Sequence, residues 1–242
     1  MREESITAVL TTKIAKDKHD RKGRGWLHRA AEAGDLYMLR TVVNAGGPSL
    51  CISSPYQSVI TPTYLAGKEG HTEVIQFILS LQQDLREFVT SIDRSVLLAC
   101  GYTGNLKLVM KVLRALKYPR NLTSFFVRCP RVPLIHAAAY GGNPCIIRQF
   151  AKRGADVFSV THCHLTPLHV AAFKGHYHAI KLLVYYKVPI DAVDKFGRTA
   201  WSIAKGCGHC EAVQLLVKLG AKKEGRCDNV SFRWKDLDWC LN

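Results

Sequence analysis

The sequence has no long apolar run and few acidic residues relative to its basic ones. No stretch approaches the roughly 20 consecutive apolar residues that a membrane-spanning helix needs, and the apolar stretch from Ile6 to Leu10 is too short for the core of a secretory signal. Only 19 aspartates and glutamates stand against 34 lysines and arginines in 242 residues, which gives a formal net charge of +15. These features predict an intracellular protein, cytoplasmic or alternatively nuclear, that prefers acidic or anionic partners.

Catalytic motifs are missing as well. The sequence contains neither G-x-S-x-G, H-E-x-x-H nor G-x-x-x-x-G-K-[ST], and no protein-kinase signature. Its nine cysteines are an odd number scattered from Cys51 to Cys240, which does not suit the disulfide framework of a small secreted domain. We therefore expect reduced thiols, no enzymatic activity in this chain and no cofactor.

What the sequence does contain is an internal repeat. Short segments ending in glycine recur at spacings of 33 to 37 residues, at Gly34, Gly70, Gly104, Gly141, Gly175 and Gly208. A period of this length is typical of stacked helix-turn-helix repeats. The spacing predicts six units.

The fifth unit is the best defined. Thr166 can cap a first helix with its hydroxyl, and Pro167 suits the first helical position, where no backbone N–H is needed. Gly175 suits a left-handed turn between two helices. The loop tip before the sixth unit has Gly197, and the fifth unit has His164 there, a residue that tolerates positive φ.

These residues resemble the ankyrin repeat, whose signature T-P-L-H-x-A is matched in full by Thr166 to Ala171. The other units are degenerate echoes, carried by Trp26-Leu27-His28, Thr61-Pro62, Arg94 to Ala99, Val132-Pro133-Leu134 with Ala137 to Ala139, and Thr199 to Ala204. The resemblance covers about residues 25–222 and implies an all-α ankyrin-repeat solenoid of about six repeats. Residues 1–24 are then a basic N-terminal extension, and residues 223–242 a C-terminal cap or the start of a linker.

A second resemblance is to the N-terminal ankyrin region of animal leucine-rich repeat kinases. It is carried by the order of the degenerate repeats, by the stretch from Phe126 to Leu134 and by the ending from Trp234 to Trp239. It implies that the chain is the regulatory arm of a longer multidomain protein kinase. It brings no catalytic residue into this sequence.

Two cysteine-histidine clusters invite a chemical interpretation. Cys207-Gly208-His209-Cys210 has the spacing of a redox motif, but Gly208-His209 falls at the same repeat position as Gly175-His176, so we interpret it as an interhelical turn. The cluster His162-Cys163-His164, with His178 as a further ligand, lacks the second ligand pair of a zinc site. We expect no metal there.

The ankyrin resemblance implies a binding surface along the loop tips and the exposed ends of the first helices. The partner would be another protein or another domain of a longer parent chain. Carried over unit by unit, the partner-binding residues are Tyr102, Thr103, Arg128, Arg131, Tyr140, His162, Phe173, Lys174, Lys195, Phe196 and Arg198. Their mixture of aromatic and basic side chains predicts an acidic or phosphorylated segment as the partner.

A basic central region leaves an alternative open. Residues 94–155 contain eleven lysines and arginines and no acidic residue, and Lys107, Lys111, Arg114 and Lys117 form one helical stripe. This stripe is either a solvated outer face or a binder of nucleic acid or of a membrane surface with anionic lipids. No recognised nucleic-acid-binding module accompanies it.

Overall fold

The computed structural model describes residues 26–46, 61–80, 97–115 and 132–225. These residues form helices, turns and loops without any strand, which confirms the predicted all-α class. The predicted extension at residues 1–24 and nearly all of the predicted cap at residues 223–242 lie outside the described residues. The domain boundaries therefore stay a prediction.

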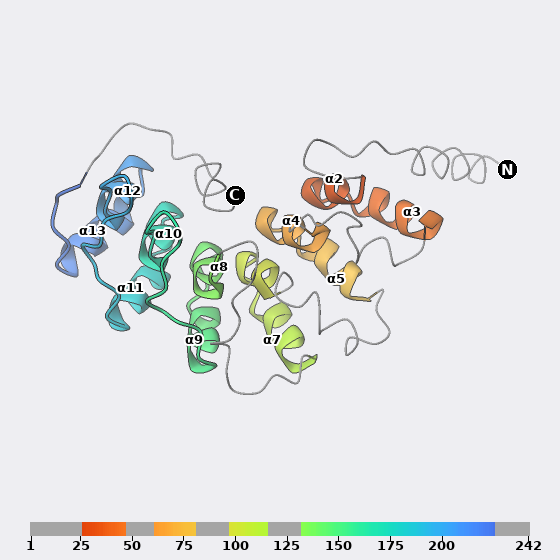
Figure 1. Cartoon of the computed structure of the whole chain (residues 1–242), viewed down its shortest axis with the longest axis horizontal. Coiled ribbons are helices and arrows are strands. Elements are labelled where there is room, and N and C mark those ends of the chain that lie inside the picture. Colours follow the sequence, from red (N-terminus) through yellow and green to blue (C-terminus); the bar gives the residue numbers. More distant parts are fainter. Residues whose placement is uncertain (1–25, 47–60, 81–96, 116–131, 226–242) are drawn as a thin grey trace. The chain divides into compact units, whose positions relative to one another are not determined.

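The helices of the described residues come in antiparallel pairs, one for each predicted repeat (Figure 1). The pairs are α2 (Trp26–Ala33) with α3 (Leu36–Gly46), α4 (Pro62–Glu69) with α5 (Thr72–Ser80), the helical residues 97–102 with α7 (Leu106–Ala115), α8 (Leu134–Gly141) with α9 (Pro144–Lys152), α10 (Pro167–Phe173) with α11 (Tyr177–Tyr185), and α12 (Ala200–Gly206) with α13 (Cys210–Lys218). None of the described helices has the length and apolar character needed to cross a membrane.

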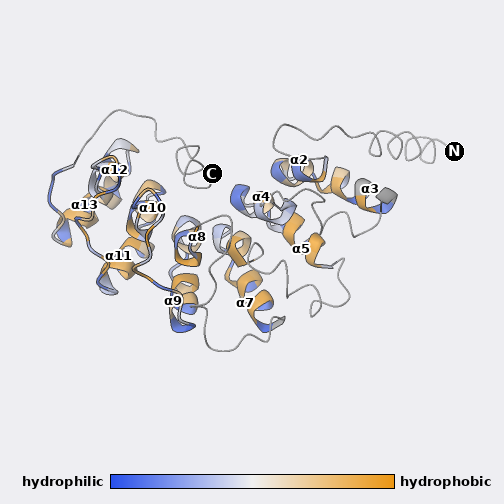
Figure 2. Cartoon of the chain, in the orientation of Figure 1, coloured by the Kyte–Doolittle hydropathy of each residue, from blue (hydrophilic) through white to orange (hydrophobic). Residues whose placement is uncertain are grey.

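The chain divides into two compact units. Helices α2 to α5 and residues 97–102 belong to the first unit, helices α8 to α13 belong to the second, and α7 spans the division. In the second unit, each first helix packs on the next first helix and each second helix on the next second helix. Figure 2 shows apolar residues along these helices and hydrophilic residues at their ends.

The core of the second unit combines small and large apolar side chains. Ala171 and Ala172 are fully buried where α10 lies between α8 and α12, and Ile147 and Phe150 of α9 are fully buried as well. The small alanine side chains let the first helices approach closely. A single helix pair could not bury these faces alone, so stability depends on the stacking of neighbouring repeats.

Local signals in the fifth repeat act as predicted. Thr166 is the N-cap of α10, its hydroxyl accepts the backbone N–H of His169, and Pro167 occupies the first turn. Gly175 has φ of 70° between the two helices. A Cβ at Gly175 would also lie 2.7 Å from the ring of His209, so both backbone conformation and space require glycine here.

The fourth repeat corrects the sequence prediction by one residue. Gly141 was expected at the interhelical turn, but it ends α8, and Gly142 takes the left-handed conformation with φ of 73°. Likewise the echo Val132-Pro133-Leu134 aligned Pro133 with Pro167 of the signature, but Pro133 is the N-cap of α8 and Leu134 begins the helix. Gly142 and Pro133 lie 33 residues before Gly175 and Thr166, their counterparts in the fifth repeat.

Histidines after the interhelical turns join consecutive repeats. The Nε2 atom of His176 bonds the carbonyl of Tyr140 at 2.8 Å, that of His209 bonds the carbonyl of Phe173 at 2.9 Å, and that of His71 bonds the carbonyl of Glu32 at 3.1 Å. Since a carbonyl only accepts, each Nε2 carries the proton and donates it. These histidines therefore have a structural role.

Candidate functional site

The loop tip from Asp194 to Arg198 is built around one aspartate. The Oδ1 atom of Asp194 accepts the backbone N–H groups of Phe196 and Arg198, both at 2.9 Å. Its Oδ2 atom accepts Nε of Arg198 at 2.7 Å and pairs with Nη2 at 2.6 Å. Asp194 is buried, and a two-pronged Arg–carboxylate pair fixes orientation as well as charge. The tip is therefore held in one shape by its own bonds.

This tip presents an aromatic ring and a lysine. The Phe196 side chain is 49% exposed, with the Arg198 guanidinium 4.7 Å from its ring centroid, and Lys195 is exposed beside it. Arg198 is itself largely covered, with 16% of its side chain exposed. Of the three predicted contact residues on this tip, Phe196 and Lys195 thus face outward, and Arg198 mainly supports them.

The preceding loop tip contacts this one through the backbone. The N–H of Lys195 donates to the carbonyl of Cys163 at 3.0 Å, and His162 is exposed next to it. His164 has φ of 59°, so the predicted positive φ is confirmed. Cys163 is buried and disulfide-bonded, so the expectation of a reduced thiol is wrong for this residue. Its sulfur is not the thiolate that a metal site would need.

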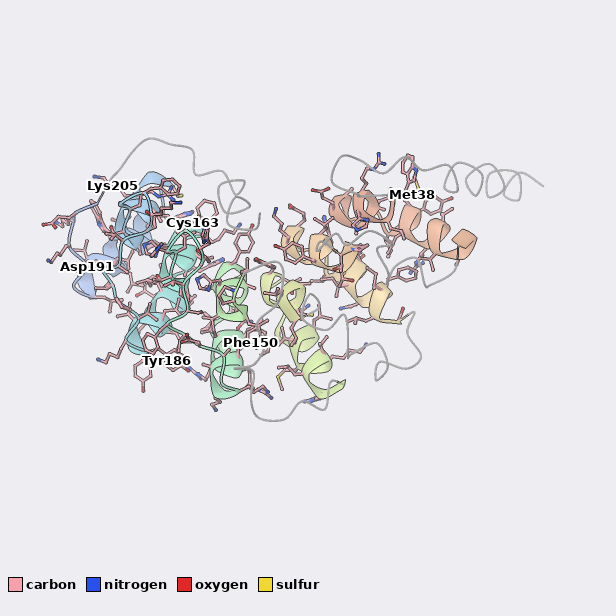
Figure 3. All side chains as sticks on the ribbon, viewed as in Figure 1. Met38, Phe150, Cys163, Tyr186, Asp191 and Lys205 are labelled. Carbon is pink, nitrogen blue, oxygen red and sulfur yellow. The ribbon has the colours of Figure 1, made fainter. Side chains whose placement is uncertain are left out.

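The ends of the first helices carry a second group of predicted residues. The Lys174 ammonium lies 4.4 Å from the ring centroid of Tyr140, which joins the ends of α8 and α10 by a cation–π contact. Tyr140 and Phe173 are partly exposed and Lys174 is exposed. The Lys205 ammonium lies similarly over Trp201 of α12, at 4.9 Å (Figure 3 labels Lys205). Aromatic and cationic groups thus alternate along these helix ends.

Tyr102 does not fit the predicted binding surface. Only 4% of it is exposed, because its ring packs edge to face on Tyr64 with 5.8 Å between the ring centroids. Its neighbour Thr103 is partly exposed, and its hydroxyl donates to the carbonyl of Cys100 at 2.8 Å. The predicted residues Arg128 and Arg131 lie outside the described residues.

Three exposed apolar side chains in the loops before α10 and α12 were not predicted from the sequence. Phe158 is exposed, and Val160 and Val193 are 53% and 58% exposed. The two valines stand 33 residues apart and therefore at the same repeat position. That spacing was the available signal, since a core valine has no reason to recur in a loop. These side chains extend the apolar part of the loop surface.

The two cysteine-histidine clusters have structural explanations. Gly208 has φ of 76° and His209 bonds the preceding repeat, which confirms the turn interpretation of Cys207 to Cys210. Both cysteines are free, and burial raises the pKa of the Cys207 thiol, the opposite of a reactive redox cysteine. Within the described residues, no three metal-capable side chains are gathered at one point. His178 lies on α11 beside the ring of Tyr177.

The basic stripe of α7 is exposed where the structure describes it. Lys107, Lys111 and Arg114 are exposed, whereas Lys117 lies outside the described residues. The opposite face buries Leu108, Val109, Val112 and Leu113. Leu106 and Met110 are only partly buried.

Comparison with known proteins agrees with this architecture. Residues 134–226, which include the helices α8 to α13, match the family model for ankyrin repeats in three copies. Ankyrin repeat domain-containing protein 37 of Bos taurus is 34% identical over 91 residues, which is 38% of this chain and 57% of that protein.

Two further curated relatives are larger proteins. Putative glutaminase 2 of Caenorhabditis elegans is 35% identical over 102 residues, 41% of this chain and 17% of that protein. The potassium channel SKOR of Arabidopsis thaliana is 27% identical over 190 residues, 78% of this chain and 22% of that protein. The chain thus spans between 17% and 57% of the length of these relatives.

Ankyrin repeats generally mediate binding between proteins. Residues 134–226 of this chain match the ankyrin-repeat model, and the described residues have the all-α fold of stacked helix pairs that such repeats form.

Proposed function

We propose that this chain binds an acidic or phosphorylated segment of another protein, or of another domain of a longer parent chain, along the loop tips and first-helix ends of its second unit. The observation that carries the proposal is the tip from Asp194 to Arg198, which holds an exposed Phe196 in a fixed position. A preordered tip loses little conformational entropy on binding. Ankyrin repeats are binding modules, and the proposal assigns no catalysis to this chain.

The charge of the second unit supports an acidic partner. Residues 132–225 contain twelve lysines and arginines and five acidic residues. Three of the five are aspartates occupied with backbone N–H groups: Asp156 accepts from Phe158, Asp191 from Lys222, and Asp194 from Phe196. These three aspartates therefore serve the loops internally, while Glu211 and Glu224 are exposed, as are lysines such as Lys174 and Lys195. Such a surface attracts anionic partners and repels basic ones.

Truncation of the loop tip tests the proposal. A photo-cross-linking residue in place of Phe196 should capture the partner, and its binding segment should then be measured with the Phe196→Ala variant of the full chain. Phe196→Ala should weaken binding by about 1 to 4 kcal/mol, the range of interface hot spots. Tyr37→Ala is the matched control, since Tyr37 is an exposed aromatic residue of the first unit. Equal affinity for both variants would refute the proposal.

The alternative function has its own observation. Lys107, Lys111 and Arg114 lie exposed on one side of α7, within the acid-free region of residues 94–155. This supports binding of an anionic surface, nucleic acid or lipid. If all cross-links to the partner fell on this stripe and none on the loop tips, the alternative would replace the first proposal.

The place of the chain in a larger protein is a separate proposal. The resemblance to leucine-rich repeat kinases supports a regulatory arm that contacts other domains of the same protein. Sequencing the full transcript tests this, because leucine-rich repeats followed by kinase motifs in the same reading frame are expected. An open reading frame without them would contradict it.

A further inference from the structure

One lysine stands at a position where the neighbouring repeats have glycine. The residue after the C-cap of the second helix is Gly154 in the fourth repeat, Lys187 in the fifth and Gly220 in the sixth, at intervals of 33 residues. All three have a left-handed backbone, with φ of 85°, 65° and 96°. This conformation disfavours any residue with a Cβ, and lysine is not among the types that tolerate it best.

The fold gains nothing visible from a side chain at this position. The N–H of Lys187 donates to the carbonyl of Val184 at 2.9 Å, and the N–H groups of Gly154 and Gly220 make the equivalent bonds at 3.0 Å. The Lys187 side chain is exposed, and within the described residues it takes part in no ion pair. A glycine would therefore keep the turn and relieve the strain. Residues held in a strained backbone conformation cluster at functional sites.

Lys187 lies in an exposed basic region. Helices α9, α11 and α13 pack side by side, and repeat positions coincide on them: Arg148 with Lys181, and Lys152 with Tyr185 and Lys218. We use the name basic face for a set of six exposed residues on and after these helices: Arg148, Lys152, Lys181, Tyr185, Lys187 and Lys218. Tyr185 is 76% exposed, and Tyr186 follows it at the end of α11 (Figure 3).

Acidic groups are scarce around this face. Among the exposed residues of the three helices, Glu211 is the acidic one, and it lies in the first turn of α13, away from the C-terminal ends. In the adjoining loops, Asp156 and Asp191 are hydrogen-bonded to backbone N–H groups. Lysines at helix C-termini also complement the helix dipole, which explains Lys152 and Lys218. It does not explain Lys187, which follows the helix at a strained position.

We propose that the basic face binds the surface of an anionic lipid bilayer, with Lys187 and Tyr185 at its centre. Four of its five cations are lysines, which are depleted in the cores of protein interfaces but suit the diffuse attraction of a membrane surface. Tyrosine is favoured at the boundary between lipid and water. This surface consists of second helices, whereas the loop tips and first-helix ends form the proposed partner site.

Vesicle binding of the full chain tests this proposal. The wild-type protein should co-sediment with vesicles of phosphatidylcholine and phosphatidylserine and not with phosphatidylcholine alone, and binding should weaken with added salt. Lys187→Gly should raise the melting temperature and yet lower the affinity for anionic vesicles about fivefold, the loss expected for one lysine near a charged bilayer. Lys187→Arg should retain the affinity.

His164→Gly is the matched control. It relieves the same left-handed strain at a loop tip outside the basic face, so it should stabilise the protein without changing vesicle binding. Unchanged vesicle binding by Lys187→Gly would overturn the proposal, and so would the absence of wild-type binding to anionic vesicles. Binding to polyglutamate or duplex DNA with the same dependence on Lys187, but not to vesicles, would replace the lipid by an acidic protein or a nucleic acid.

Discussion

The fourth and fifth repeats place a histidine at the same position and bond it differently. His136 of α8 and His169 of α10 are both buried, and each Nε2 donates to a carbonyl of the following loop, that of Leu165 at 2.8 Å and that of Arg198 at 3.1 Å. Their Nδ1 atoms differ. Nδ1 of His169 accepts from the N–H and the hydroxyl of Thr166, at 3.1 and 2.8 Å.

The cause of this difference is one residue before each helix. The N-cap of α8 is Pro133, which has neither an N–H nor a hydroxyl, and it makes no side-chain cap hydrogen bond. Nδ1 of His136 is therefore buried, and no group of the described residues forms a hydrogen bond with it. In both repeats the histidine of the signature bonds the next loop through Nε2. It also takes part in capping its own helix only in the fifth repeat, where threonine is the N-cap.

The largest expected effect comes from the burial of His136 and should appear in acid. Burial lowers the pKa of His136 from 6.5 to about 4, although the hydrogen bond to the carbonyl of Leu165 acts in the opposite direction. Between pH 6.5 and pH 4, His136 is protonated in the unfolded chain but neutral in the folded protein. The contribution of neutral His136 to the free energy of unfolding is therefore fully present above pH 6.5 and is lost as the pH falls towards 4. The loss at the end of this range is about 3 kcal/mol.

Denaturant unfolding at several pH values measures this. His136→Gln keeps a polar side chain and removes the titration, so its stability should depend less on pH than that of the wild type between pH 6.5 and 5. Burial also lowers the pKa of His169 and His176, which leaves a residual slope in the variant. Parallel pH profiles of the two proteins would contradict the assignment to His136.

Much of this architecture could be predicted from the sequence, because local chemistry determines it. Thr166, Pro167 and Gly175 act through their own backbone neighbours, and each lies where the repeat signature places it. His164 was expected at positive φ for the same local reason. These features depend on caps and turns within a few residues, which one sequence displays directly.

The errors came from register and from contacts between repeats. Counting back 33 residues from Thr166 and Gly175 gives Pro133 and Gly142, but the proline of the fourth repeat was matched to the proline of the signature. The burial of Tyr102 depends on Tyr64, which lies in another repeat. Of the candidate site, the loop-tip residues were foreseeable, whereas the supporting role of Asp194 needed the folded loop.

Removal of the threonine hydroxyl should have a moderate effect. Thr166→Val keeps the shape of the side chain but takes one hydrogen bond from Nδ1 of His169 and the cap from α10. We expect a loss of about 1 to 2 kcal/mol in the free energy of unfolding. Equilibrium denaturation measures this loss. Thr161→Val and Thr41→Val are unsuitable as neutral controls, because the hydroxyls of Thr161 and Thr41 form hydrogen bonds of their own. A loss below the error of the method would show that the backbone N–H of Thr166 suffices.

The smallest effect should come from giving the fourth repeat the cap of the fifth. In Pro133→Thr, a hydroxyl and an N–H become available to Nδ1 of His136, and the backbone of residue 133, with φ of −65° and ψ of 148°, accepts threonine without strain. The cap should stabilise the protein by about 1 kcal/mol, and part of this gain is offset because the unfolded chain becomes more flexible without proline.

Pro133→Ala separates the two contributions, since it removes the proline and supplies an N–H but no hydroxyl. We expect the order of stability Pro133→Thr, then wild type, then Pro133→Ala, measured by denaturant unfolding at neutral pH. The His136 Nδ1 resonance should shift in both variants, because each supplies a backbone N–H, and it should shift further in Pro133→Thr, where a hydroxyl also reaches this atom. If threonine and alanine gave equal stability and the same shift, the hydroxyl would not reach His136. The missing partner of Nδ1 would then reflect the packing of α8, and the comparison of the two repeats would rest on burial instead of capping.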